Sequence, residues 1–322
     1  MEVVAVDLGG TNVRFAIAEV SDGRVAALGP PTTLHTNSFA GLPNAWAAYA
    51  AQAGRPLPRA AAMAVACPIA GDVLKLTNSP WVIRPASLAA ELHIDLLTLI
   101  NDFGAVAHAV AQLPDAFMAH IAGPDVALPR VGVVGVLGPG TGLGVAHVLR
   151  WANDYAVMET EGGHVDWAPV DSIDDALLAI LRARYRRVSA ERVVSGPALA
   201  SIYEHLAGME GNSARAPADP VLWASALDGS DRLAVAALDR FCMALGSVAG
   251  DLALMQGAQG IVVAGGLGAR LAGVLPHSGF SARFTAKGRM EGVLAALPVR
   301  LIIHPEPGQY GAAAAFAREH AA

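Results

Sequence analysis

A carboxylate followed by a glycine-rich turn lies at the start of the chain. The run Asp7-Leu8-Gly9-Gly10-Thr11-Asn12 separates one apolar stretch, Glu2 to Leu8, from another, Val13 to Val20. Paired glycines let backbone N–H groups approach phosphate oxygens with no Cβ in the way, and a carboxylate at position 7 suits Mg²⁺, most simply through water. The run therefore indicates a phosphate loop on a hairpin, although an ordinary Gly-Gly hairpin turn has the same composition.

A second loop repeats this pattern in the other half of the chain. Gly138-Pro139-Gly140-Thr141-Gly142-Leu143-Gly144 also lies between two apolar stretches, and two such loops facing each other would hold a polyphosphate from both sides. Neither loop is a Walker A or Rossmann motif, because a strand and not a helix follows the first, and lysine occurs only at Lys75 and Lys287. A third glycine run, from Gly265 to Gly268, admits an adenosine against the backbone or forms a tight strand-to-helix turn.

An amide beside a carboxylate follows the apolar stretch Leu96 to Ile100. Asn101 fixes the orientation of a substrate hydroxyl, and Asp102 accepts its proton, which is what phosphoryl transfer to an alcohol needs. The alternative interpretation is that Asp102 caps the helix that follows.

Two further acids and a histidine have the hydrogen-bonding character that a sugar ring requires. Glu161 and His164 flank a Gly-Gly turn, and Glu191 lies in Ser189-Ala190-Glu191-Arg192. Vicinal hydroxyls bind well to bidentate acceptors and mixed donor–acceptor groups. The alternatives are a solvated loop for Glu161 and His164 and an exposed helix-end charge for Glu191. Zinc is not indicated, because His108, His147 and His164 lack metal-ligand spacing.

Strands and helices alternate along the chain, which predicts an α/β protein. Both glycine loops join two strands. Further strands are predicted at Ala61 to Ala66, Leu96 to Ile100, Gly260 to Ala264 and Val299 to Ile303. Helices are predicted at Ala105 to Leu113, Asp175 to Tyr185, Pro197 to Leu206 with Ser195 as its N-cap, Ala236 to Met255, and Tyr310 to His320.

Composition limits the classes of protein that remain. A chain of 322 residues with 54% hydrophobic and 16% charged residues suits two packed lobes, and a net charge of -6 offers no basic footprint for nucleic acid or an anionic membrane. Cys67 and Cys242 are too far apart in sequence to predict a disulfide framework. The N-terminal stretch has no basic region and contains Asp7, so we expect a cytoplasmic protein. Residues 131–149 carry no Asp, Glu, Lys or Arg, but six glycines and a proline favour two strands over a membrane span.

Taken in order, these motifs resemble the bacterial glucokinase family, which has an actin-like, hexokinase-related fold. The motifs that carry the resemblance cover almost the whole chain: Asp7 to Arg14, Ala66 to Gly71, Thr77-Asn78, Ile100 to Phe103, Gly138 to Gly144, Glu161 to Asp166, Val188 to Arg192, and Gly265-Gly266. One departure is Pro139, which removes a backbone donor, so the second loop is expected to depend on Thr141 and its neighbours.

The resemblance implies a two-lobed, duplicated ribonuclease H-like fold with a cleft between a small lobe, about 1–110 with 300–322 packing back on it, and a large lobe, 111–299. It implies Asp102 as general base and Mg²⁺ at Asp7. Sugar contacts are implied at Asn78, Asn101, Asp102, Glu161, His164 and Glu191. ATP contacts are implied at Val6, Asp7, Leu8, Gly9, Gly10, Thr11, Asn12, Gly140, Thr141, Gly142, Gly265 and Gly266. A homodimer is usual in the family, and zinc is not expected because the segment directly after His164, Val165-Asp166-Trp167-Ala168-Pro169, contains no cysteine.

The activity this implies is ATP-dependent phosphorylation of glucose at its 6-hydroxyl, with lobe closure excluding water as a competing nucleophile. A kinase for another hexose or an amino sugar fits the same motifs. A non-catalytic sugar sensor on the same fold, or an actin-like ATPase, is also compatible with the fold. Sensors that regulate transcription usually carry an N-terminal helix-turn-helix, whereas this chain opens on its first predicted strand.

Overall fold

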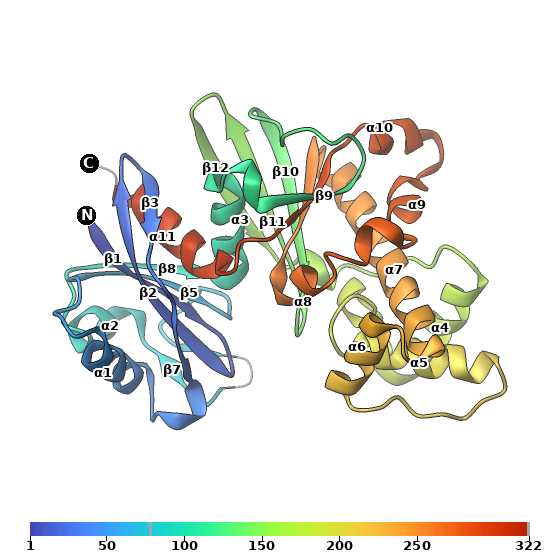
Figure 1. The fold of residues 1–322 in the computed structure, drawn as a ribbon, viewed down its shortest axis with the longest axis horizontal. Coiled ribbons are helices and arrows are strands. Elements are labelled where there is room, and N and C mark those ends of the chain that lie inside the picture. Colours follow the sequence, from blue (N-terminus) through green and yellow to red (C-terminus); the bar gives the residue numbers. More distant parts are fainter. Residues whose placement is uncertain (77–78, 321–322) are drawn as a thin grey trace. The chain divides into compact units, whose positions relative to one another are not determined.

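The computed structural model describes residues 1–76 and 79–320, which fold into two compact units. The first unit contains Met1–Pro114, Val157–Glu159 and the chain from His304 onward. The second contains Asp115–Ala156 and Thr160–Ile303. Figure 1 shows the consequence for the first unit: the C-terminal helix, drawn red, packs with the blue N-terminal strands.

The first unit is built on a mixed sheet in the order β3-β2-β1-β5-β8, with β4 paired to β2. β1 runs antiparallel to β2 and parallel to β5, which is itself parallel to β8. The strands are β1 (Glu2–Leu8), β2 (Asn12–Ser21), β3 (Arg24–Leu28), β4 (Thr32–His35), β5 (Ala60–Val65) and β8 (Leu96–Asn101). A small separate hairpin contains β6 (Leu74–Lys75) and β7 (Val82–Ile83).

Alternate residues of these strands face two different cores. Val4, Val6 and Leu8 pack with helices α1 (Leu42–Ala53) and α2 (Pro85–Glu91) on one face of the sheet. Val3 and Ala5 lie on the other face with α3 (Asp102–Gln112) and α11 (Pro307–Glu319). This period-2 alternation between two apolar layers fixes the strand register, so the strand ends that carry the polar motifs are fixed as well.

The second unit repeats this architecture, as the sequence predicts. Its sheet has the order β12-β11-β10-β13-β14-β9, in which β10 is antiparallel to β11 and parallel to β13, as β1 is to β2 and β5. The strands are β9 (Met118–Ala122), β10 (Gly132–Pro139), β11 (Leu143–Trp151), β12 (Asp154–Thr160), β13 (Gly260–Val263) and β14 (Val299–Ile302), and within β12 the residues Val157–Glu159 belong to the first unit. The prediction of a hairpin at 131–149 is therefore confirmed.

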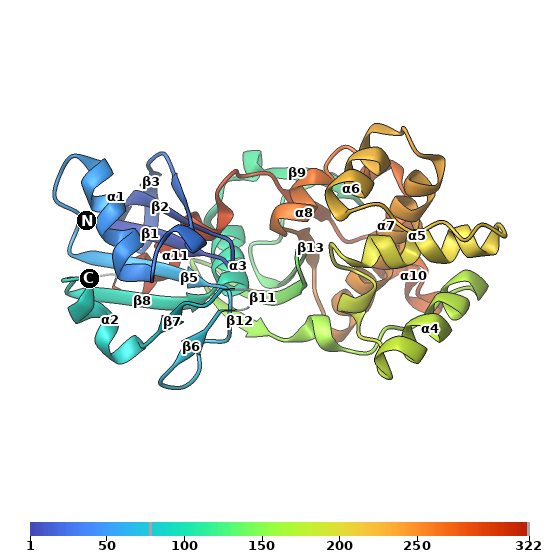
Figure 2. The same ribbon diagram turned by 90° about the horizontal axis from the view of Figure 1, so that it is seen from below.

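Helices form most of the second unit's core around the long helix α7, with which α5 and α6 pack (Figure 2). The helices are α4 (Ser172–Tyr185), α5 (Ala198–Met209), α6 (Asp219–Asp228), α7 (Arg232–Gln256), α8 (Gly265–Arg270), α9 (Phe280–Thr285) and α10 (Glu291–Ala295). Short 3-10 turns that matter below are Gly162–His164 and Ala190–Arg192.

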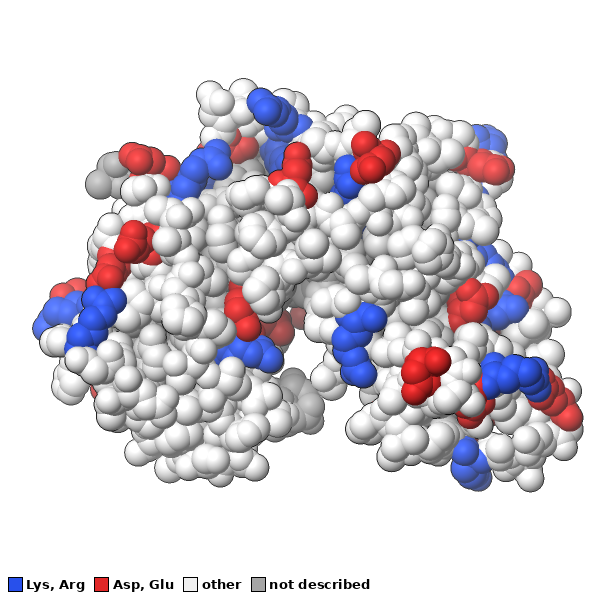
Figure 3. All heavy atoms as spheres, in the orientation of Figure 1, with Lys and Arg blue, Asp and Glu red and all other residues white. Residues whose placement is uncertain are grey.

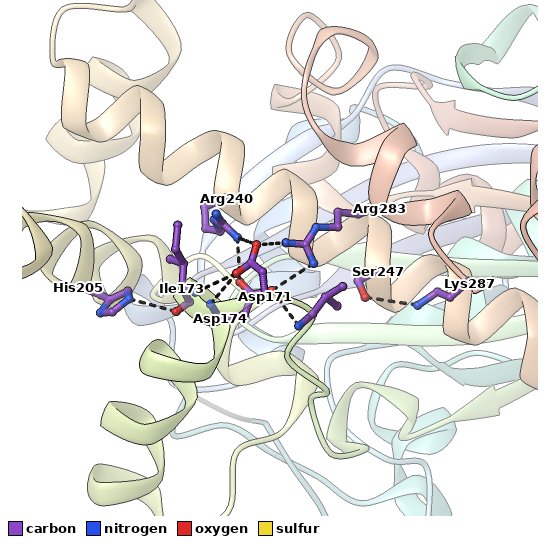
Figure 4. A network of polar contacts seen from close by, with 9 residues as sticks. Asp171, Ile173, Asp174, His205, Arg240, Ser247, Arg283 and Lys287 are labelled. Carbon is purple, nitrogen blue, oxygen red and sulfur yellow. Dashed lines mark hydrogen bonds and ion pairs between the residues drawn. The ribbon is translucent and has the colours of Figure 1, made fainter.

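A buried ionic network joins three of these helices (Figure 4). Asp171, the N-cap of α4, bonds Arg240 of α7 at 2.5 Å and also contacts Arg283 of α9. Asp174 lies 3.3 Å from each of the same two arginines. Because both charges of each pair are matched, the network tolerates burial and holds the helices in register.

Several helices begin earlier than the sequence indicates. α4 begins at Ser172 and not at Asp175, because Asp171 caps it by accepting the N–H groups of Ile173 and Asp174. α7 begins at Arg232 and not at Ala236, because Asp231 caps it in the same way.

The prediction that Ser195 caps α5 is wrong. The helix begins at Ala198, its N-cap position is Pro197, and no side chain caps it. The Ser195 carbonyl accepts the Ala198 N–H in a preceding turn.

Two observations bear on membranes and polyanions. One helix, Arg232–Gln256, has the length and apolarity of a membrane span, but 72% of its apolar window is buried inside the structure, as in the core helix of many folded proteins. On the face shown in Figure 3, acidic and basic side chains are interspersed over the residues drawn in colour.

Candidate active site

The first glycine loop closes a tight hairpin in the first unit. Gly9 donates its N–H to the Asn12 carbonyl at 3.0 Å. The buried Thr36 ties the loop from outside, donating its hydroxyl to the Gly10 carbonyl at 2.8 Å and its N–H to the Thr11 carbonyl at 2.9 Å. Within the described residues the N–H groups of Gly10 and Thr11 take no protein acceptor, so they are the amides this loop can offer to a phosphate.

Asp7 lies at the end of β1 beside this loop. Arg14 donates to its carboxylate at 3.0 Å, and the same guanidinium lies 3.8 Å from Glu306. Gly308 leaves room for the Asp7 carboxylate, because a Cβ at position 308 would lie 3.0 Å from the Asp7 Cγ. Burial raises the pKa of Asp7, and the Arg14 charge and hydrogen bond oppose the shift.

Asn101, not Asp102, caps helix α3. The Asn101 side chain accepts the N–H groups of Phe103 at 2.9 Å and Gly104 at 3.2 Å, and donates to the Cys67 carbonyl at 3.2 Å. The alternative interpretation, in which Asp102 caps the helix, is therefore wrong. Asn101, which was predicted to contact the sugar, uses its side chain to cap α3.

Asp102 is the first residue of α3, and its carboxylate accepts the Phe103 N–H at 2.9 Å and its own backbone N–H. Burial raises its pKa to about 6, with a further contribution from the negative charge of Asp7 and a smaller one from Glu159. A carboxyl with a pKa near the working pH is a suitable general base.

In the second unit the two remaining glycine runs come together. A Cβ on Gly265 would lie 2.9 Å from the Pro139 carbonyl, so only a glycine, here with φ of 82°, allows α8 to begin against the second loop. Within that loop Gly140 donates its N–H to the Gly142 carbonyl at 2.8 Å, and its own carbonyl accepts the Gly196 N–H at 2.7 Å. The loop is therefore held from both sides.

The acids and histidine predicted to bind sugar also form one cluster in the second unit. Glu191 accepts the Leu143 N–H at 3.0 Å, directly after the second loop. The His164 ring lies 4.0 Å from Glu191 and 3.8 Å from Glu161. Arg187 fixes the loop by donating to the His164 carbonyl at 2.7 Å.

Exposure distinguishes the members of this cluster. The Glu191 side chain is 26% exposed, whereas that of Glu161 is 71% exposed. Glu191 is thus a held acceptor and not a free helix-end charge, while Glu161 extends into solvent and stays available for a ligand.

One predicted residue, Asn78, lies outside the described residues. Others with a part in the site were not assigned one from the sequence: Thr36, which ties the first loop, Arg14 and Glu306 beside Asp7, and Glu159 beside Asp102. Arg14 follows the first motif directly, which is a usable signal. Thr36, Glu306 and Glu159 come from distant segments, and no local pattern marks them.

The carboxylates of the first unit fit a magnesium ion. Among the described residues no group of three or more His, Cys, Asp and Glu side chains could hold a metal ion by itself. Mg²⁺ usually needs fewer, since it keeps several waters and is bound by one or two carboxylates together with substrate phosphates. Asp7 and Asp102 are close enough to raise the pKa of Asp102 by charge repulsion, so a cation would be favoured there.

The duplicated α/β fold carries glycine loops on two hairpins, a carboxylate at the start of a helix, and a cluster of acceptors suited to hydroxyl groups. These features together are those of a kinase that acts on a sugar. The glucokinase family model matches residues 4–319. The chain belongs to the glucokinase family.

Individual relatives agree with this assignment. The chain is 58% identical to a glucokinase of Zymomonas mobilis over 320 residues, 99% of each chain. It is similar to the crystal structure of a glucokinase from an Antarctic psychrotroph, with a TM-score of 0.85, 34% identity and 98% of both chains covered. A glucokinase of the ROK family from Streptomyces griseus, solved with glucose and AMPPNP, shares the fold at a TM-score of 0.64, 19% identity and coverage of 99% and 100%.

Proposed function

We propose that this protein is an ATP-dependent glucokinase that transfers the γ-phosphoryl group of ATP to the 6-hydroxyl of glucose. Family membership supports the reaction, and one observation in the structure supports the assignment of its base. Because Asn101 caps helix α3, the Asp102 carboxylate is free to accept a proton, and its pKa of about 6 leaves it mostly ionised at neutral pH.

Asp102 accepts the proton of the attacking hydroxyl as the new O–P bond forms and the bond to ADP breaks. The transition state of phosphoryl transfer carries spread negative charge, so positioning and charge stabilisation supply most of the catalysis. The Gly10 and Thr11 amides are suited to bind phosphate oxygens in the first unit, and the Gly140 to Gly142 loop with Gly265 is suited to bind nucleotide in the second.

Mg²⁺, which Asp7 would hold with water and phosphate oxygens, supplies neutralisation of charge on the transferred group. Arg14 keeps the Asp7 carboxylate oriented, because its guanidinium also interacts with Glu306. Glu306 has a pKa raised by its own burial, and Arg14 opposes that shift.

The Glu161, His164 and Glu191 cluster binds the hydroxyls of glucose. Glu191 is immobilised by the Leu143 N–H, and His164 is held through its carbonyl by Arg187. Glu191, the least exposed acceptor of the cluster, discriminates against a sugar that lacks the matching hydroxyl, since its carboxylate would then lose a hydrogen bond.

A coupled ADP-release assay with ATP and Mg²⁺ across a panel of hexoses and amino sugars tests this function. Glucose should give the highest kcat/KM of the panel. A higher value for another sugar would assign a different hexokinase activity, sugar binding without turnover would indicate a sensor, and sugar-independent ADP release would indicate an ATPase. Replacing ATP with ADP or polyphosphate in the same assay identifies the phosphoryl donor.

The sugar cluster has its own test in Glu161→Ala. Because Glu161 is exposed and contacts only His164 among the ion pairs of the described residues, its loss should leave the fold intact and raise the KM for glucose more than the KM for ATP. Equal changes in both constants would remove Glu161 from the sugar site.

We further propose that the protein is a cytoplasmic homodimer and that it catalyses the entry step of glycolysis. Family resemblance supports the dimer, and two buried, unpaired cysteines suit a reducing compartment. Light scattering during gel filtration measures the mass in solution, and a value of one chain would exclude the dimer.

A further inference from the structure

Helix α3, which carries the proposed base, begins with only half of a capping box. In the complete motif the N-cap side chain accepts the N–H of residue N3, and a Glu or Gln at N3 reaches back to the N–H of the N-cap. Asn101 performs the first part, since it accepts the N–H groups of Phe103 and Gly104. The N3 residue is Gly104, which has no side chain to perform the second part.

Glu159 of β12 occupies the missing place. A Cβ built on Gly104 would lie 2.6 Å from Cδ and 2.7 Å from Cγ of Glu159, so the glutamate fills the space that an N3 side chain would use. Burial raises the pKa of the Glu159 carboxyl, and a hydrogen bond from the backbone N–H of Asn101 opposes that shift. Both residues belong to the first unit, which includes Val157–Glu159.

We propose that Glu159 completes the capping box of α3 from a distant strand and is thereby a positioning residue for Asp102. This inference rests on the proposed function, in which Asp102 is the base. The box holds Asn101 by its side chain and by its main chain, and Asp102 is the next residue, so the direction of its carboxylate is set by the same contacts.

Two further observations favour this role over chance proximity. Partial burial raises the pKa of Glu159, so holding its charge at this place costs free energy that a freely solvated glutamate would avoid. The negative charge of Glu159 also acts on Asp102, because it contributes, after burial and Asp7, to the raised pKa of Asp102. Asp102 in turn acts on Cys67, whose pKa is raised by burial and by the Asp102 carboxylate.

The test is an exchange of the carboxylate between the two positions. Glu159→Ala should lower kcat by about 10-fold, the low end for loss of a group that orients a functional side chain, with both KM values within about twofold of the parent. Glu159→Gln keeps an acceptor for the Asn101 N–H and should stay within about threefold of the parent kcat. The double variant E159A/G104E restores the box within the helix and should recover most of the lost turnover.

Gly104→Ala provides a variant that keeps Glu159. Alanine is the better helix former by about 1 kcal/mol, so a purely structural role for this place predicts a fold at least as stable and an unchanged kcat. The proposal predicts a lower kcat, because the new Cβ displaces the carboxylate from the Asn101 N–H. Circular dichroism melting on each variant confirms that it is folded.

A kcat equal to that of the parent in E159A or G104A would overturn the proposal. It would also be overturned if E159A lost turnover and both E159Q and E159A/G104E showed the same loss. Asp102→Asn is measured beside them. If D102N keeps its turnover, the proposed base is wrong whatever the Glu159 variants do. If D102N is inactive while E159A and G104A match the parent, the function stands and only the role of Glu159 fails.

Discussion

Asp102→Asn should make this protein more stable while removing most of its activity. The folded-state pKa of Asp102 is about 6, against an ordinary value of 3.8. A carboxyl with a raised pKa binds its proton more tightly in the folded state than in the unfolded state, so its contribution to stability is complete below about pH 4 and is lost as pH rises through 6. A shift of about 2 units at 1.36 kcal/mol each corresponds to about 3 kcal/mol at pH 7.5.

Asparagine avoids this cost because it has no charge to desolvate, and its amide oxygen still accepts the Phe103 N–H that Asp102 binds at 2.9 Å. Urea unfolding followed by circular dichroism should therefore show a higher midpoint for D102N at pH 7.5, with the gain shrinking as pH falls toward 4.5. Turnover in the ADP-release assay should fall by at least about 10²-fold, the low end for loss of a positioned base.

The control is Asp95→Asn, the same change at an exposed carboxylate. Asp95 bonds Arg59 at 2.6 Å, which holds its pKa below the ordinary value, so its neutralisation should bring no gain in stability at pH 7.5. Equal stability of D102N and the parent at pH 7.5 would refute the raised pKa, and turnover within a few-fold of the parent would refute the role as base.

Three further outcomes are expected. In the parent, kcat/KM should fall on the acid side with an apparent pKa near 6, because Asp102 of the free enzyme must be ionised to accept a proton; a profile flat from pH 5 to 8 would contradict this. Gly142→Ala should raise the KM for glucose, since its Cβ would lie 3.2 Å from Cδ of Glu191, whereas Gly140→Ala, whose Cβ would meet nothing within 4 Å and so leave Glu191 in place, should leave the KM for glucose unchanged. Gln309→Leu should stabilise the fold by about 1–3 kcal/mol in urea unfolding, because both amide atoms are buried without a partner among the described residues; a loss would show that they are bonded.

The sequence predicts the fold well where a local pattern determines the structure. Each glycine loop lies between two strongly apolar stretches, so the hairpins β1–β2 and β10–β11 and their duplication follow directly from alternation and turn chemistry. Helix starts were predicted less well, because apolar periodicity shows where a helix packs, while its first turn is set by a polar cap. Asp171 and Asp231 are such caps, and each lies ahead of the first periodic residue.

The site was predictable as a set of motifs but not as a set of contacts. The first loop depends on Thr36, and Asp7 depends on Arg14 and on the absence of a side chain at Gly308. Asp7 lies near the start of the chain and Gly308 near its end. From a single sequence, a glycine that leaves room for a distant carboxylate cannot be distinguished from any other glycine.

The order of two residues, Asn101 before Asp102, illustrates what the structure adds. Either side chain could cap a helix, and the sequence alone left this open. In the structure the neutral amide takes the cap, so the acid next to it stays half-buried near Asp7, where its hydrogen bonds come from the backbone N–H groups of Phe103 and of Asp102 itself. The raised pKa values of Asp7 and Asp102 show that ionising both carboxylates costs free energy, which the nearby Arg14 only partly offsets. A bound cation, or a proton taken from a hydroxyl group, would reduce this electrostatic cost. We therefore place the reaction at these two carboxylates.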